Sequence, residues 1–343
     1  MPNLPKPRLR RGARSRVDAF APTPAPPEPN VEILEHAGLR WINIERPSAI
    51  DRAWLEEHFE FHPLDYEDVV SRNQRPKIDE YDNYLFIVLH FPVYDKGVGR
   101  LNAGELDMFV GPDFLITIPN VPFQPVEYLF ESCRSSEDLR DQLFSQGPGY
   151  LLYKIVDDSF DYCFPMLRKM GNKLDRLEED IFEGGAEEVV RDISNAKQEI
   201  INFRKIIRPQ RPVLRDLERT KQRYLAPEMD VYFDDIVDAS ERIWDMLENY
   251  KEVVEALEDT NESVLSHRVN DVLRILTSFN LVILPLTLIG TIWGMNVAVP
   301  GQGSIEAFWL IIAGMVVVLA AATASRAFGR RSASPPTARP SRR

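Results

Sequence analysis

The most hydrophobic part of the chain lies close to its C-terminal end. Residues 275–296 include no charged side chain, and this stretch ends on Gly294, Met295 and Asn296. A second uncharged, apolar stretch covers residues 307–324. A helix needs about 20 apolar residues to cross the ~30 Å hydrocarbon core of a bilayer. The pattern therefore predicts two membrane-spanning helices, joined by a short loop at residues 297–306.

Basic residues predict how this hairpin is oriented. Arg268 and Arg274 precede the first stretch, residues 295–306 contain no Lys or Arg, and six arginines lie in the tail at residues 325–343. Basic residues near a span favour the cytoplasmic side. We therefore expect a multi-pass protein of the cell (inner) membrane, with both termini in the cytoplasm and the loop outside.

A helical pattern leads into the first span. Apolar residues alternate spacings of four and three, which predicts a coiled-coil seam; they are Ile243, Leu247, Tyr250, Val254 and Leu257. The seam runs without Gly or Pro into the apolar stretch, so residues 230–296 are predicted to form one stalk helix. About 60 residues at 1.5 Å per residue span roughly 90 Å. Such a helix requires neighbours, in a bundle or an oligomer.

Two amphipathic helices are predicted before the stalk, within a long helical hairpin at residues 149–229. The first covers residues 150–182 and stops at Glu183-Gly184-Gly185. The second covers residues 186–225, and its pattern is interrupted at Pro209 and Pro212.

Residues 31–148 predict a mixed α/β domain. Ser48 is placed to cap one helix, and a second short helix follows His62-Pro63. Strand patterns alternate with turn-rich segments and cover residues 38–44, 84–91, 104–110 and 114–118. The expected fold is an α+β membrane protein with a sandwich-like N-terminal domain. Residues 1–30 are basic and Pro-rich, and are expected to be a disordered tail.

Composition narrows the function classes. The chain has 343 residues, a net charge of −12 and 27% charged residues, which argues against a nucleic-acid binder and favours cationic partners. Its two cysteines, Cys133 and Cys163, are too few for a disulfide framework and suit a reducing cytosol. No phosphate-binding loop is visible, so neither an enzyme nor ATP-driven pumping is expected, and no organic cofactor is predicted.

His58 and His62 are four residues apart and raise the question of a zinc pair on one helix face. Pro63 argues against it, because the residue before proline is disfavoured in the α region. A surface or packing role is the expected alternative.

Four segments of the chain are WINIERPS, FHPLDYEDVVSRNQRPKIDEYDNYLFIVLH, GYLLYKIVDD and LPLTLIGTIWGMNV. They resemble the CorA-type family of divalent-cation transporters, and the resemblance extends over residues 39–324. The resemblance implies a cytoplasmic α/β domain, a stalk continuous with the first span, and a second span. It also implies a Gly-Met-Asn signature at the outer end of the first span and a homopentameric, funnel-like assembly embedded in a lipid bilayer.

A pore chemistry follows from the signature. One hairpin cannot enclose a hydrated ion, so a pore requires several copies around an axis. Magnesium usually keeps several of its waters. A ring of neutral Asn296 side chains would hold the hydrated ion through carbonyl oxygens, as a selectivity filter in which Gly294 allows close backbone approach and Met295 packs. The alternative is that Asn296 only caps the helix.

Positions at helical spacing from Asn296 predict the rest of the pathway. They are Thr291, Thr287, Leu284, Asn280, Leu276, Leu273 and Asn270. The resemblance implies a pore lining at each of these except Asn280. The leucines would gate the pore by excluding water. Alternatively, the leucines form bundle core, and the threonines bond to carbonyls within their own helix.

The resemblance also implies regulation by metal bound between cytoplasmic domains, which closes the pore when internal magnesium is high. The implied carboxylates are Asp68 and Asp259 at one site, and Glu67, Asp157 and Asp235 at a second. Oxygen-only ligands suit magnesium.

The loop after the signature, VAVPGQGSIEAFW, departs from the family pattern and carries one acid, Glu306. Met295 favours magnesium or cobalt over the zinc branch of the superfamily. Three hypotheses remain: a metal-gated magnesium channel, a zinc or other transition-metal transporter with or without proton coupling, and a non-transporting, membrane-anchored coiled-coil scaffold.

Overall fold

A computed structural model describes residues 28–71, 74–95, 97, 100–183, 186–220, 225, 229–295 and 303–331. The chain divides into two compact units, Met1–Thr260 and Asn261–Arg343. Most of the predicted N-terminal tail and of the C-terminal basic tail lies outside the described residues, as do Asn296 and most of the loop after it.

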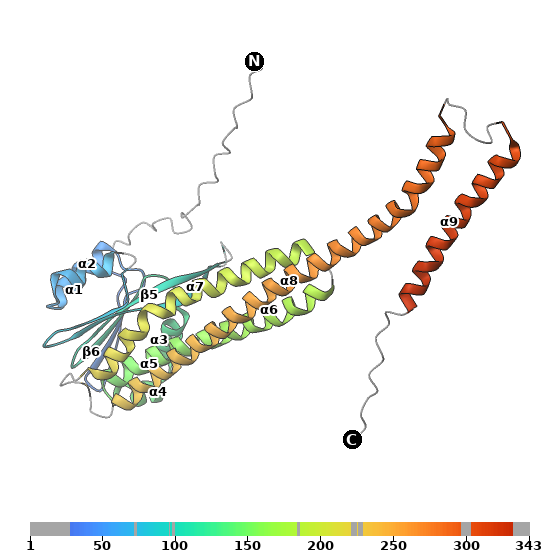
Figure 1. Ribbon diagram of the computed structural model, residues 1–343. Helices are drawn as coiled ribbons and strands as arrows, with labels where there is room; N and C mark the ends of the chain where they lie inside the picture. Colours follow the sequence, from blue (N-terminus) through green and yellow to red (C-terminus); the bar gives the residue numbers. More distant parts are fainter. Residues whose placement is uncertain are drawn as a thin grey trace, which may run out of the picture. The chain divides into compact units, whose positions relative to one another are not determined.

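The first unit is built on a six-stranded sheet in the order β1-β2-β6-β5-β4-β3 (Figure 1). β2 and β6 are parallel, and every other neighbouring pair is antiparallel. The strands are β1 (Glu32–His36), β2 (Leu39–Asn43), β3 (Lys77–Glu80), β4 (Leu85–Asp95), β5 (Arg100–Val110) and β6 (Phe114–Pro119). All four predicted strands are present. β1 and β3 were not predicted, because their short, charged sequences EILEH and KIDE do not show the pattern of a strand.

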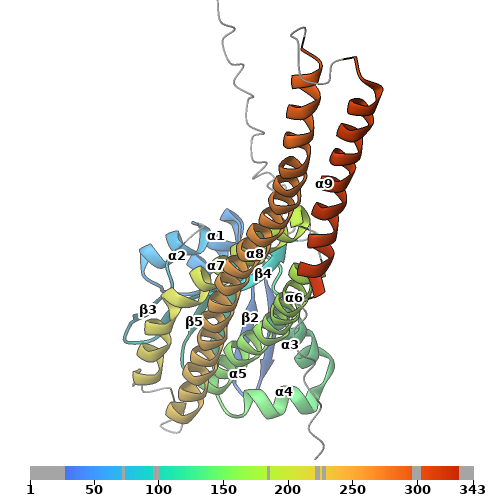
Figure 2. The same cartoon turned by 45° about the vertical axis from the view of Figure 1, so that its right-hand side comes forward.

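Helices cover both faces of this sheet, which agrees with the expected sandwich-like domain (Figure 2). One face packs against α1 (Ala49–His58) and α2 (Pro63–Val70). The other packs against α3 (Gln124–Ser135), through Trp41 and Phe130, and against α5 (Pro148–Asp161), through Phe91 and Phe160. β4 is therefore buried on both sides, which explains its continuous apolar run. Neither α3 nor α4 (Glu137–Phe144) was predicted.

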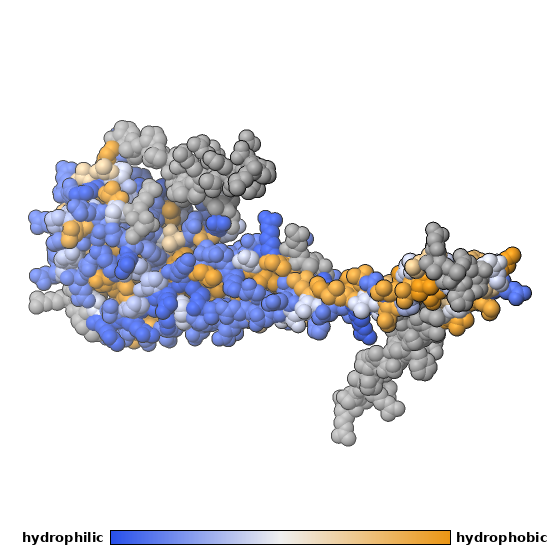
Figure 3. Space-filling view, turned by 45° about the horizontal axis from the view of Figure 1, so that its top comes forward, coloured by the Kyte–Doolittle hydropathy of each residue, from blue (hydrophilic) through white to orange (hydrophobic). Residues whose placement is uncertain are grey.

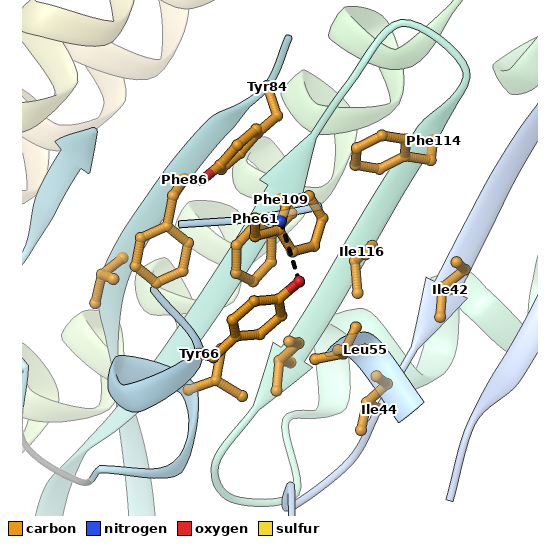
Figure 4. Close-up of a cluster of buried hydrophobic side chains, with 13 residues drawn as sticks. Ile42, Ile44, Leu55, Phe61, Tyr66, Tyr84, Phe86, Phe109, Phe114 and Ile116 are labelled. Carbon is orange, nitrogen blue, oxygen red and sulfur yellow. Dashed lines mark hydrogen bonds between the residues drawn. The ribbon is translucent and has the colours of Figure 1, made fainter. Parts of the chain in front are cut away.

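A helix cap and the contacts of Phe61 hold α1 and α2 in position. Ser48 caps α1 as predicted, and the Asp51 carboxylate accepts a hydrogen bond from the Ser48 backbone N–H at 2.7 Å. Phe61, which lies between the two helices, stacks on Phe109 at a ring-centroid distance of 4.2 Å. Its backbone N–H donates to the Tyr66 hydroxyl at 3.0 Å (Figure 4). The chain between α1 and α2 is thus held down by both apolar contact and a buried hydrogen bond.

Three long helices complete the first unit: α6 (Cys163–Glu183), α7 (Ala186–Arg219) and the N-terminal part of α8 (Met229–Trp293). The predicted seam residues of α8 are buried, except that Tyr250 is half-buried. The Tyr250 hydroxyl packs so closely on α6 that a Cβ added at Gly171 would lie 2.8 Å from its oxygen. The neighbours that steady this part of the stalk are therefore α6 and α7 of the same chain.

Two predicted boundaries are corrected. The helix expected at residues 150–182 is two helices, because α5 ends at Asp161 and α6 begins at Cys163. α7 continues through Pro209 and Pro212, where an interruption was expected, and ends at Arg219, short of residue 225. Both prolines are exposed. Water can therefore satisfy the carbonyls that lose their helical partner.

The second unit contains the rest of α8 and α9 (Ile305–Arg331). Within the described residues, α8 is the helix that is long and apolar enough to cross a membrane, and the apolar segment Ile305–Val317 of α9 is shorter. Hydrophobic residues gather on α9 and on the C-terminal part of α8 (Figure 3). Helix α8 is continuous over 65 residues, which confirms one helix running from the seam through the apolar stretch.

Replacing Phe61 by Ala is expected to destabilise the first unit by about 3 kcal/mol, because the removed ring leaves a cavity among buried aromatic side chains. The midpoint of urea unfolding of the detergent-solubilised protein, followed by near-UV circular dichroism, measures the loss. Tyr128→Ala is the matched control, since Tyr128 is 74% exposed. Equal midpoints for the two variants would contradict the packing role of Phe61.

Candidate ion pathway and metal-binding carboxylates

The predicted pore-lining residues lie along α8 in the second unit, at spacings of three, four and, between Leu276 and Leu284, eight residues. Leu273, Leu276 and Leu284 are exposed by 51%, 56% and 68% in the single chain. Asn270, Thr287 and Thr291 are exposed as well. These leucines are therefore not core residues of the isolated chain. An exposed apolar surface on an uncharged helix requires lipid or other helices to cover it.

Both threonines donate hydrogen bonds within α8. The Thr291 hydroxyl donates to the carbonyl oxygen of Thr287 at 2.8 Å, and the Thr287 hydroxyl donates to that of Ile283 at 2.5 Å. A hydroxyl that has donated its proton still offers oxygen lone pairs to a cation or to its hydrating water. Back-bonding and pore lining are therefore compatible at these two positions.

The end of this face is described only in part. Gly294 closes the helix, and its N–H donates to the carbonyl oxygen of Gly290 at 3.0 Å. Met295 is 56% exposed. Asn296, the residue with the sharpest predicted role, lies outside the described residues, so its geometry stays a prediction. Pro285 stands inside α8 and supplies no N–H to the carbonyl of Leu281, four residues earlier.

Asp68 on α2 is held by a lysine. Its carboxylate accepts from the Lys77 ammonium at 2.7 Å, and Lys77 also pairs with Asp79. Burial acts to lower the pKa of Lys77, but the hydrogen bonds to Asp68 and Asp79 outweigh it and raise that pKa to about 12. The ammonium stays charged at neutral pH. A metal ion at Asp68 would therefore compete with Lys77 for carboxylate oxygens.

Asp157 on α5 belongs to a carboxylate triad with Asp158 and Asp161, whose ligand atoms lie within 4.8 Å of one another. Lys154 binds this triad, at 3.2 Å from Asp157 and 2.7 Å from Asp158. Burial raises the pKa of Asp157; Lys154 opposes the rise, and the charges of Asp161 and Asp158 add to it. Asp158 and Asp161 were not predicted from the sequence, although the spacing in DDSFD puts residues 157 and 161 on one helix face.

Tyr153 lies within the influence of two predicted ligands, Asp157 and Asp235. Its hydroxyl donates to the Asp235 carboxylate on α8 at 3.2 Å. Burial, together with the negative charges of Asp157 and Asp235, raises the pKa of Tyr153 to about 12. Of the three carboxylates predicted for the second metal site, Asp235 therefore contacts Tyr153, and Asp157 acts on the same tyrosine through its charge.

Glu67 and Asp259, the remaining predicted ligands, are exposed. Asp259 contributes, together with Glu258 and Glu255, to a raised pKa of Lys197 on α7, where the hydrogen bond from Lys197 to Glu258 is the largest cause. In the described part of the chain, Asp68 and Asp259 therefore lie among different charged neighbours. A shared site would have to form between copies of the chain.

The two candidate zinc histidines are used locally. The ring of His58 stacks on Trp54, and its Nδ1 lies 2.8 Å from the Trp54 carbonyl oxygen. His62 caps α2, where its Nδ1 accepts from the Leu64 N–H at 3.3 Å. α1 ends at His58 and α2 begins after His62, so the pair does not share a helix.

Comparison with known proteins agrees with these features. A family model described as CorA-like Mg2+ transporter protein matches residues 36–325. The cobalt/magnesium transport protein CorA of Thermotoga maritima is 31% identical over 259 residues, which cover 75% of this chain and 72% of the relative. The protein of the same description from Methanocaldococcus jannaschii is 23% identical over 296 residues, which cover 85% of this chain and 92% of that one.

Solved structures share the fold. The complete CorA magnesium transporter from M. jannaschii superposes with a TM-score of 0.73 and 22% identity, covering 84% of this chain and 90% of that chain. The ZntB cytoplasmic domain from Vibrio parahaemolyticus gives a TM-score of 0.58 and 16% identity, covering 67% and 88%. At these identities the structures establish the fold alone. Because the family model covers most of the sequence and a relative is 31% identical, the chain belongs to the CorA-like Mg2+ transporter family, a family of membrane transporters and not of enzymes.

Proposed function

We propose that the protein is a channel for divalent cations, Mg²⁺ and also Co²⁺, which assembles as a homopentamer in the cell (inner) membrane with both termini in the cytoplasm. The observation that carries this proposal is the composition of α8. One continuous helix bears acidic positions in the first unit and an uncharged, apolar segment that ends on the Gly-Met-Asn signature. The family match and the cobalt/magnesium description of a relative support the choice of ion.

Transport would begin with a hydrated ion at a ring of Asn296 side chains. Neutral carbonyl oxygens accept hydrogen bonds from the waters of the ion and bind it weakly enough for release. Further along the pore, the Thr291 and Thr287 oxygens would contact the same waters. Leu284, Leu276 and Leu273 would then form the narrow apolar part, which closes by excluding water, and Asn270 would follow.

Closure would depend on Mg²⁺ bound between neighbouring first units. Asp68 and Asp259 would form one site, and Glu67, Asp157 and Asp235 a second. A divalent ion shared between carboxylates of adjacent copies reduces the repulsion expected between chains that each carry a net charge of −12. The bound Mg²⁺ is thus both cargo and regulator. Binding of Mg²⁺ would draw neighbouring first units together, and release of Mg²⁺ would let them separate.

The zinc alternative has one point in its favour, the likeness to the ZntB cytoplasmic domain. That likeness shows fold alone, so zinc is treated as an outcome of the transport test. The non-transporting scaffold is tested by the same variants.

Asn296→Ala is expected to abolish Mg²⁺-dependent growth rescue of a transport-deficient bacterium, because a methyl group cannot bind the waters of the ion. Wild type should rescue growth. Asn249→Ala is the control, since Asn249 is exposed on α8 in the first unit. Rescue by Asn296→Ala would contradict the proposed filter and favour the scaffold. Uptake of labelled Zn²⁺ that depends on a pH gradient, without Mg²⁺ rescue, would favour the zinc transporter.

Asp259→Lys is expected to weaken closure by internal Mg²⁺, because an ammonium replaces a ligand and repels the ion. Losing about 1.4 kcal/mol of binding would raise the half-inhibitory Mg²⁺ concentration roughly tenfold. Current recorded from proteoliposomes at varied internal Mg²⁺ measures this shift. Glu252→Lys, at another exposed acidic position of α8, makes the same charge change as a control. An unchanged response would remove Asp259 from the sensor.

Asp157→Asn is expected to raise the melting temperature of metal-free protein at pH 7 by roughly 2 °C, which corresponds to somewhat less than 1 kcal/mol. Burial and the neighbouring carboxylates disfavour the charged form in the folded state, as the raised pKa shows. The gain should vanish below the ordinary Asp pKa of 3.8, where folded and unfolded chains are both protonated.

Added Mg²⁺ should reverse the order of the two proteins, because wild type gains a bound ion and Asp157→Asn gains less. Asp180→Asn, an exposed position on α6, is the control for the charge change. If Mg²⁺ stabilises wild type and Asp157→Asn equally, Asp157 is not a ligand.

A further inference from the structure

A basic pocket lies between α7 and α8 in the first unit. It has a volume of about 190 Å³ and is lined by Ile201, Arg204, Lys205, Arg208, Trp244 and Lys251. All of its ionisable residues are cations, although the whole chain has 53 acidic and 41 basic residues. The charge of this pocket is thus opposite to that of the molecule.

Three other basic residues of α7 pair with acidic residues of α8. Lys197 pairs with Glu258, and both Arg211 and Arg215 pair with Glu241. Two of the four cations that line the pocket are paired as well. Arg204 pairs with Glu248 at 2.5 Å and Lys251 with Glu255 at 3.4 Å.

Lys205 and Arg208 make no ion pair within the described residues, and both are exposed. They add two uncompensated positive charges to one wall of the pocket.

Trp244 lines the pocket, and its ring stacks against two guanidinium groups. Arg204 lies 4.8 Å from its ring centroid and Arg211 lies 5.0 Å from it. The stacking fixes guanidinium planes that would otherwise move freely. It also leaves the Arg204 Nη1 atom buried without a hydrogen-bond partner. An ordered guanidinium with an unused donor is suited to an oxyanion, because its N–H groups match oxyanion geometry.

We propose that this pocket binds a phosphate-bearing anion between α7 and α8. Its volume of about 190 Å³ is well above the ~10–15 Å³ that a single water requires, so a small polyatomic anion can enter. Arg204, Lys205 and Arg208 would contact the anion from α7, and Lys251 would contact it from α8. Binding would join the two helices through a shared counter-ion and would require no metal. The inference does not depend on the transported ion.

The test uses full-length protein in phosphatidylcholine nanodiscs without divalent metal, titrated with inorganic pyrophosphate by calorimetry. Wild type should bind, and affinity should fall as NaCl rises, because salt screens charge. The double variant Lys205→Glu/Arg208→Glu should weaken binding at least roughly tenfold, through the loss of two charge-assisted contacts. Both positions are exposed, so the fold is retained, and unchanged circular dichroism would verify this.

The double variant Arg168→Glu/Lys169→Glu, which reverses two exposed charges on α6, makes the same change in net charge and should bind pyrophosphate as wild type does. A second arm, nanodiscs containing phosphatidylglycerol, separates the two sources of phosphate. Reduced pyrophosphate affinity there in wild type, but not in the double variant, would identify a lipid headgroup as the competing ligand. Equal affinity in both lipids would identify a soluble phosphate compound.

Two results would overturn the proposal. One is equal pyrophosphate affinity in wild type and in the double variant. The other is no binding by wild type at 1 mM pyrophosphate, roughly the concentration at which a −4.1 kcal/mol interaction is half-saturated. Neither result would affect the proposed cation channel, whose residues lie elsewhere.

Discussion

Helix α8 is one continuous element of 65 residues, and the single backbone hydrogen bond that Pro285 removes does not end it. The helix runs from Met229 to Trp293 and changes its surroundings along the way. Its first part buries a heptad seam, and its last part exposes uncharged apolar residues. In hydrocarbon, a backbone group without an internal partner costs several kcal/mol, which favours a helix that stays intact through such a segment. The proposed sensor carboxylates Asp235 and Asp259 therefore share one covalent element with Thr287 and Thr291.

Lysines pair with two of the five candidate metal-binding carboxylates, Asp68 and Asp157. Lys77 binds Asp68, and Lys154 binds Asp157 and Asp158. An ammonium group is a weaker counter-ion than a divalent cation, but it limits the repulsion that a partly buried carboxylate cluster would otherwise experience. A metal ion at Asp68 or Asp157 would compete with these lysines for the same carboxylate oxygens. The α7–α8 pocket has the opposite imbalance of charge. Its four cations have ion pairs only at Arg204 and Lys251, among the described residues.

Much of the fold follows from local pattern, and the exceptions have physical causes. The Ser48 cap, the buried run of β4 and the seam of α8 were predictable because each depends on neighbours within a few residues. β1 and β3 were missed because their charged sequences become strands only by pairing with β2 and β4. α7 continues through two prolines because both face solvent, and that exposure is not visible in the sequence.

The order of residues was enough to predict the uncharged apolar segment at residues 275–296, the heptad spacing before it and the family resemblance. The first two are periodic patterns along one helix, and the third is a match of segments at residues 39–324. Packing in three dimensions was needed to show that α6 and α7 of the same chain bury the seam, that Lys77 and Lys154 pair with acidic residues, and that Asp158 and Asp161 join Asp157. Several of these contacts join residues far apart in the chain, and even the local ones depend on burial and side-chain orientation that folding sets.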